Sequence, residues 1–199
     1  VRHPLAKTES ATPEEQAIVV RDLLSAGGVV AVKLAQMLAE DPKVPLNYRR
    51  LLGKLREDNE PMTAAEVWRA IPPVMRKRIE ALGPCLGVGS VKQVHRAKFA
   101  DGKQYAMAVL RSNVEDEALA SLMALEASDE LGIVAKRLSR LVFGEFYLFG
   151  EGEALAEFAQ TTIGKHPRFR VVKVIHHSPK LLVEEIADGP TLAQVLGSV

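Results

Sequence analysis

This sequence of 199 residues has a single cysteine, almost no excess of charge and no long apolar run. The single cysteine, Cys85, excludes an internal disulfide, and five scattered histidines do not complete a structural zinc set with it. The formal net charge of +1 argues against nucleic acid binding through bulk charge, which needs a strongly basic face. No apolar run approaches the roughly 20 residues that a membrane span requires. These absences predict a globular protein of a reducing compartment that binds no nucleic acid and does not cross a bilayer.

The N-terminus shows no signal peptide, that is, no basic segment followed by an apolar one. The chain begins at Val1, and we expect it to be a domain of a longer protein. The expected location is the cytoplasm or the matrix side of an organelle, and peripheral attachment to a membrane stays open.

The first 82 residues carry mainly helix signals. Thr12, followed by proline and two glutamates, is typical of a helix N-terminus, because the threonine caps it and the acidic side chains lie at the positive end of the helix dipole. Thr63 and Glu66 have the spacing of a capping box. We expect helices over residues 13–26, 29–40, 46–57 and 63–71, and a short basic helix that reaches Leu82.

From Gly83 onward the apolar residues alternate, which is typical of strands. Residues 86–98 and 104–111 read as strands joined by a hairpin at Asp101-Gly102. Helices within 114–141 and over 145–160 are expected next, then strands over 169–176 and 180–186 and a short helix after a turn at Asp188. This order predicts an α+β fold.

The stretch Gly87-Val88-Gly89-Ser90-Val91-Lys92 reads as a strand, a glycine-rich turn and the start of a second strand. Two glycines one residue apart let a backbone approach an anion and direct N–H groups at it, as in phosphate-binding loops. Val94 then falls where a nucleotide kinase places an apolar side chain over adenine. A plain β-hairpin is the alternative for the same residues.

Several segments, together with the order of the elements, resemble the UbiB/AarF family of atypical kinases. Residues 28–38, GVVAVKLAQML, resemble the K-x-G-Q extension of that family, with Lys33 and Gln36 as its lysine and glutamine. Residues 90–97, SVKQVHRA, are similar to its S-I-G-Q-V-H-R-A, and residues 182–189, LVEEIADG, to its hinge L-T-M-E-Y-I-D-G. The helix expected over 145–160 has the spacing that places Glu151 at the glutamate of helix αC. The resemblance covers residues 26–196.

The resemblance implies a protein-kinase-like N-lobe, an antiparallel sheet plus an αC-type helix, with a helical extension in front. The extension would span residues 1–82 and the N-lobe residues 83–199, through the hinge, with the C-lobe absent from this chain. ATP or ADP with magnesium is the implied ligand. Lys33 and Gln36 would pack over the mouth of the active site and restrict access of protein substrates. The implied nucleotide contacts are Gly87, Val88, Gly89, Ser90, Lys92, Val94, Ala106, Glu151 and Glu185.

The sequence contains neither the catalytic-loop aspartate nor the D-F-G magnesium site of a kinase, so no catalytic or metal-binding residue is expected in this chain. By itself it should be inactive. In the complete protein, the resemblance implies ATPase or small-molecule kinase activity linked to isoprenoid lipid or quinone metabolism, such as ubiquinone biosynthesis, at a membrane. The alternative is a non-catalytic pseudokinase or scaffold module that binds a partner.

The nucleotide site departs from the family pattern at several residues, among them Gly87 and Gly89, which replace alanines of the family's loop. Ala108 stands where the phosphate-binding lysine of the strand is expected, and Glu184 takes an apolar gatekeeper position. Lys92, at the third glycine position of the loop, resembles the nucleotide lysine of the with-no-lysine kinases, which lack the lysine on the strand. Our hypothesis is that Lys92 points inward, pairs with Glu151 and contacts the nucleotide phosphates. The alternative is that Lys92 points to solvent.

Overall fold

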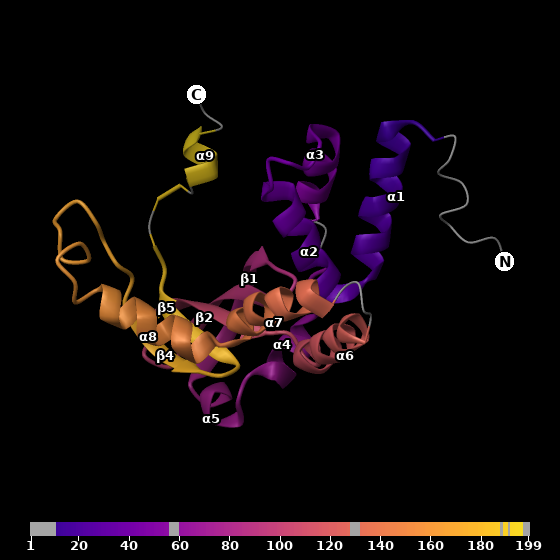
Figure 1. Cartoon of the computed structure of the whole chain (residues 1–199). Coiled ribbons are helices and arrows are strands. Elements are labelled where there is room, and N and C mark those ends of the chain that lie inside the picture. The colour runs from indigo at the N-terminus through magenta and orange to yellow at the C-terminus, as the bar shows by residue number, and fades with distance from the viewer. Residues whose placement is uncertain (1–10, 56–59, 128–131, 188, 191, 197–199) are drawn as a thin grey trace.

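The computed structural model describes residues 11–55, 60–127, 132–187, 189–190 and 192–196. Figure 1 shows the N-terminal helices on one side of the molecule and the last two strands on the other. The elements within the described residues are α1 (Pro13–Ala26), α2 (Gly28–Glu40), α3 (Leu46–Lys54), α4 (Ala64–Ala70), α5 (Pro73–Arg76), β1 (Ile79–Val88), β2 (Lys92–Phe99), β3 (Gln104–Leu110), α6 (Val114–Glu126), α7 (Gly132–Phe146), α8 (Leu148–Phe158), β4 (Val174–Ser178), β5 (Leu181–Glu185) and α9 (Leu192–Leu196).

The strands form one antiparallel sheet in the order β1-β2-β3-β5-β4. The expected hairpin joins β2 and β3. Its Gly102 has a φ of 79°, a backbone conformation that residues other than glycine rarely adopt. Val94 pairs with Ala108, and Ala106 pairs with Glu184. Because side chains alternate along a strand and paired residues point to the same side, one face of the sheet carries Lys92, Val94, Ala106, Ala108 and Glu184.

The opposite face of the sheet packs against α4 and α5. Val67 of α4, Ile71 directly after α4 and Met75 of α5 contribute buried side chains to this core. The strands add Ile79, Ala97, Phe99, Tyr105, Met107, Val109, Leu181 and Val183. Burial of this apolar surface, at about 25 cal/mol per Å², holds the short α4 in place, since a helix of seven residues is not stable alone.

A second core lies between the sheet face that carries Lys92 and the helices α2, α6, α7 and α8. It contains Val29 and Val30 of α2, Ala118 and Leu122 of α6, Leu138, Val142 and Phe146 of α7, Leu148 of α8, and Ala108 and Leu182 of the sheet. On its other side α2 packs against α1 and α3 around Ala35, Leu52 and Leu55 (Figure 1). The N-terminal helices are therefore connected to the sheet through α2.

The expected capping box at Thr63 forms, and the expected N-cap at Thr12 is a capping box as well. The Thr12 hydroxyl accepts the Glu15 N–H at 3.3 Å, and the Glu15 carboxylate accepts the Thr12 N–H at 2.8 Å. The same two bonds join Thr63 and Glu66, at 3.3 and 2.7 Å. Each box satisfies two N–H groups that a bare helix end would leave unpaired, so these helices begin where the sequence predicts.

Some of the expected element boundaries are wrong. The basic helix does not reach Leu82: α5 ends at Arg76, and β1 begins at Ile79, which pairs with Phe99 and is 8% exposed. Burial of Ile79 and pairing along the edge of β2 outweigh the local helix preference. The expected boundary between residues 82 and 83 thus falls inside β1. Division of the chain into two domains stays a prediction.

The later elements follow the expected order with shifted ends. The helix expected from residue 145 begins at Leu148, because Phe146 is buried in the second core as the last residue of α7. Strand β4 begins only at Val174, five residues after the expected start at residue 169. Helix α3 ends at Lys54, and the expected end at residue 57 lies outside the described residues, as does Asp188.

No helix in the described part of the chain has the length and apolar character needed to span a membrane. In the same residues, no three side chains of His, Cys, Asp or Glu come together in a group that could hold a metal ion. Cys85 is exposed on β1.

Candidate functional site

A cavity of about 570 Å³ lies where the β1–β2 turn, α2, the end of α7 and the start of α8 meet. Its lining consists of Gln36, Gly89, Ser90, Val91, Lys92, Gly144, Glu145, Tyr147, Gly150 and Glu151. Five of the residues singled out in the sequence, Gln36, Gly89, Ser90, Lys92 and Glu151, are therefore brought into one cavity. We call it the front cavity.

Lys92 and Glu151 form an ion pair in this cavity, between the first residue of β2 and the first turn of α8. The predicted pairing is confirmed, and the alternative in which Lys92 points to solvent is not what the structure shows. The side chains keep 32% and 43% exposure, so both remain accessible to a ligand. At such exposure an ion pair contributes little to stability, because water screens it.

Ala108 lies beside this ion pair on the same sheet face. Lys92 pairs with Leu110 and Val94 with Ala108, so Lys92 and Ala108 are diagonal neighbours across β2 and β3. Diagonal neighbours on one face are roughly 7–8 Å apart, within the reach of a lysine side chain. The ammonium group of Lys92 can therefore reach the same region as that of a lysine at position 108.

Backbone geometry distinguishes the two glycines of the turn. A Cβ at Gly89 would lie 3.0 Å from the carbonyl oxygen of Lys92, whereas at Gly87 nothing lies within 4 Å. Gly87 and Val88 belong to β1 and pair with Val94 and Gln93. The close turn therefore needs glycine at position 89 only.

Hydrogen bonds turn the carbonyl groups of this segment away from the front cavity. The Gly89 carbonyl accepts from Nε of Arg111 and the Val91 carbonyl from the Arg111 N–H, both at 2.9 Å, while the Gly89 N–H donates to the Lys92 carbonyl at 2.9 Å. In the described part of the chain, no protein acceptor takes the N–H of Ser90 or Val91. Because the Gly89 carbonyl and the Ser90 N–H point in opposite directions in one peptide plane, the Ser90 N–H points away from Arg111, and Ser90 lines the front cavity together with Lys92.

Glu184 adds a second carboxylate to this neighbourhood. It is half-buried on the face that carries Lys92. Burial raises the pKa of Glu184 above its ordinary value of 4.5, the Glu151 carboxylate raises it further, and Lys92 lowers it. One lysine is therefore placed among two carboxylates, so the three groups carry a net negative charge when all are ionised.

The remaining predicted contacts do not line the front cavity. Val94 and Ala106 lie along the same sheet face, and Ala106 is 9% exposed. Glu185 lines a different cavity of about 580 Å³, together with Arg96, Lys103 and Arg170, and its carboxylate is 3.7 Å from Arg170. Glu185 pairs with Tyr105, so its side chain belongs to the sheet face opposite the one that carries Lys92.

The extension residues lie beside the front cavity. Lys33 of α2 forms an ion pair with Glu145 in the last turn of α7, and the Lys33 side chain is only 20% exposed. Gln36 lies one helical turn further along α2 and lines the cavity itself. Helix α2 therefore lies beside the front cavity, and the expected role of Lys33 and Gln36 in restricting the access of protein substrates stays a prediction.

Sequence patterns missed Glu145, Tyr147, Gly150 and Arg111. A Cβ at Gly150 would lie 2.3 Å from Cδ1 of Tyr147, so the tyrosine ring covers this glycine and closes one wall of the cavity. A glycine in the first turn of a helix was the available signal for that contact. Arg111 lies just after β3 outside any motif, and nothing local indicated its partners.

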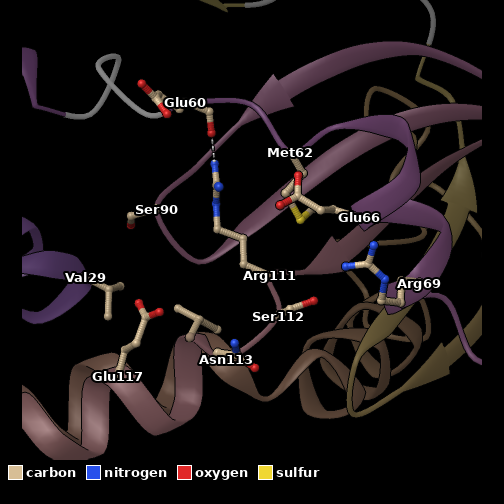
Figure 2. Close-up of a pocket in the computed structure, with 11 residues that line it drawn as sticks. Val29, Glu60, Met62, Glu66, Arg69, Ser90, Arg111, Ser112, Asn113 and Glu117 are labelled. Carbon is tan, nitrogen blue, oxygen red and sulfur yellow. Dashed lines mark hydrogen bonds between the residues drawn. The ribbon is translucent and has the colours of Figure 1, made fainter.

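A second cavity of about 470 Å³, the rear cavity, lies behind the glycine turn (Figure 2). Ser90 lines both cavities, so a single turn separates them. Figure 2 shows the Arg111 side chain crossing the rear cavity toward Glu60, with Glu66 and Arg69 of α4 on one side and Glu117 of α6 on the other. Acidic and basic side chains are mixed there, which points to no single class of ligand.

The sheet and its helices define an α+β protein with a five-stranded antiparallel sheet. No protein-family model matches the chain. The structure is similar to that of Rv3197 from Mycobacterium tuberculosis, solved in complex with erythromycin, with a TM-score of 0.60 and 23% sequence identity. The match covers 92% of this chain and 51% of that one, so this chain spans about half the length of Rv3197, and the likeness shows the fold.

Proposed function

We propose that this chain is a kinase-like N-lobe of the UbiB/AarF type that binds the phosphates of a nucleotide in the front cavity, with Lys92 in place of the missing strand lysine. The single observation that supports this most is the Lys92–Glu151 ion pair, formed across the cavity next to Ala108. A lysine held by a helical glutamate is how protein kinases position their phosphate-binding lysine.

The turn supports the same proposal. Phosphate oxygens accept hydrogen bonds from backbone N–H groups in tight turns, and Ser90 and Val91 of the turn line the same cavity as Lys92. A unit charge about 4 Å from a phosphate oxygen contributes roughly 4 kcal/mol at an effective dielectric of 20. Lys92 would therefore be the largest single contributor to phosphate binding in this cavity.

ATP and ADP fit the arrangement as extended ligands. The phosphates would lie at Lys92, Ser90 and Val91, and the base would lie along the sheet face over Val94 and Ala106. Magnesium would accompany the nucleotide and neutralise part of its charge. The described residues gather no metal-binding group, so Lys92 and the turn handle the phosphates while ligands for the metal would come from elsewhere.

The complete protein would hydrolyse ATP or phosphorylate a small molecule in isoprenoid lipid or quinone metabolism. A non-catalytic module that binds a partner is the second candidate, and the observation that favours it is the net negative charge of Lys92, Glu151 and Glu184, which opposes free phosphates. The two candidates differ in whether the chain binds a nucleotide.

The test is calorimetric titration of the chain with ATP and ADP, with and without magnesium. Lys92→Met should weaken ATP binding at least tenfold, because a charge-assisted hydrogen bond contributes about 1.5–3 kcal/mol. Lys98→Met is the matched control, since Lys98 is on the same strand and pairs with Glu80 at 2.9 Å, far from the cavity. Equal ATP affinity of the Lys92 variant and the wild type, or no binding by the wild type, would refute the proposal.

A further inference from the structure

Arg111 makes three hydrogen bonds behind the glycine turn, two of them to the turn itself. Its Nε donates to the Gly89 carbonyl and its backbone N–H to the Val91 carbonyl, each at 2.9 Å, and Nη2 donates to the Glu60 carbonyl at 2.6 Å. The side chain is half-buried in the wall of the rear cavity (Figure 2). One residue after β3 thus bonds both to the turn and to the segment that leads into α4.

The direction of these bonds decides which groups the turn presents. The Gly89 carbonyl and the Ser90 N–H belong to one planar trans peptide and point in opposite directions, so fixing this carbonyl on the rear side directs the Ser90 N–H away from Arg111. Ser90 also lines the front cavity. Without the guanidinium, the Gly89–Ser90 peptide plane is free to rotate and to place a carbonyl oxygen where an anion would bind, while the backbone bond to the Val91 carbonyl remains.

We propose that Arg111 is a positioning residue, which sets the glycine turn in the conformation that binds phosphate without touching the ligand itself. The consequence for ligand affinity rests on the proposed nucleotide function, whereas the effect on the turn does not. Arginine suits this role because its planar fork donates from Nε and Nη2 to two carbonyls at once.

The bond to Glu60 extends the same restraint to the connection between α3 and α4. Met62, two residues on, donates its N–H to Oε1 of Gln93 at 2.6 Å, and Gln93 is 1% exposed on β2. Nε2 of Gln93 is in turn 2.8 Å from Nε2 of His95. Through Arg111, hydrogen bonds connect the glycine turn to the end of β3 and to the segment between α3 and α4. These bonds hold the turn in one conformation before a ligand binds.

Hydrogen–deuterium exchange of the free chain tests the positioning directly. Arg111→Met keeps an apolar side chain but removes the side-chain donors to Gly89 and Glu60. Arg111→Lys keeps the charge with a single nitrogen as donor. Arg69→Met is the matched control, because Arg69 lines the same cavity and no bond from it to the turn exists among the described residues. We expect exchange of the Gly89 N–H, which donates to the Lys92 carbonyl inside the turn, to be several-fold faster in Arg111→Met, less so in Arg111→Lys, and unchanged in Arg69→Met.

Ligand affinity tests the consequence. ATP should bind roughly tenfold more weakly to Arg111→Met, with partial rescue in Arg111→Lys, while adenosine, which has no phosphate, should bind all variants equally. A merely structural role would weaken both ligands together. Unchanged exchange at the turn overturns the inference whatever the ligand result. Faster exchange with unchanged ATP affinity overturns its functional part, and if the wild type binds neither ligand the proposed function fails while exchange still decides the role of Arg111.

Discussion

Lys92 and Glu151 are 59 residues apart in the sequence and form an ion pair in the front cavity. Lys92 begins β2, and Glu151 lies in the first turn of α8. The pair therefore connects the sheet to the helix that crosses it, at the point where the glycine turn ends. Variants around this pair test the site from several directions.

Glu184→Gln should stabilise the chain near neutral pH. Burial and Glu151 raise the pKa of Glu184 above 4.5, so the folded state binds this proton more tightly than the unfolded state. The free energy of unfolding then falls as the pH rises from about 4.5 through the raised pKa, and the loss is complete above it. The glutamine variant lacks this loss, so its melting temperature should vary less with pH and exceed that of the wild type near pH 7.

Glu157→Gln on the exposed side of α8 is the control for this measurement. Thermal melts of the three proteins across the acidic range give the comparison. If the Glu184 and Glu157 variants have the same pH profile, Glu184 is not the source of the dependence.

Gly89→Ala and Gly87→Ala should differ in stability, although the two residues are only two positions apart. A Cβ at position 89 would press on the Lys92 carbonyl oxygen at 3.0 Å, whereas position 87 has space. We expect the Gly89 variant to lose about 1 kcal/mol of stability and the Gly87 variant to remain near the wild type. Urea denaturation measures both, and equal midpoints would contradict the assigned turn geometry.

Gly152→Ala should be among the most damaging small substitutions in α8. An added Cβ would lie 2.6 Å from Cβ of His177 and 3.2 Å from Cδ1 of Leu182, where the helix packs on β4 and β5. Overpacking of this kind costs about 1–3 kcal/mol. Gly144→Ala in α7 meets nothing within 4 Å and should instead stabilise its helix by up to about 1 kcal/mol. Opposite shifts in the urea midpoint are expected, and two losses of similar size would contradict the packing of α8.

Thr63→Ala should remove the capping box of α4. The Thr63 hydroxyl accepts the Glu66 N–H and donates to the Glu66 carboxylate, which also accepts the Thr63 N–H. The bond from the hydroxyl, and after it the bond from the backbone N–H, lower the pKa of Glu66. We expect a loss of about 1 kcal/mol at neutral pH. Since the lowered pKa adds stability only above the ordinary pKa, the difference from the wild type should shrink as the pH falls through the folded-state value. Ser139→Ala on the exposed side of α7 is the control, and an equal loss there would argue against a specific cap.

Features formed by residues that are close in the sequence could be predicted from the sequence. The N-cap at Thr12, the capping box at Thr63 and the hairpin at Asp101-Gly102 form as expected, because their bonds join residues at most a few positions apart. The meeting of Lys92 with Glu151 was also anticipated, but through the spacing of a family resemblance. The order of helices and strands followed from periodicity.

Tertiary structure alone decided the rest. Residues 79–82 form a strand, although their local sequence favours a helix, because Ile79 pairs with Phe99, twenty residues away. The front cavity, the Lys33–Glu145 pair and the three bonds of Arg111 depend on elements that meet only after folding. Contacts of this kind depend on how distant surfaces fit together, and no pattern within a short stretch of sequence encodes that fit.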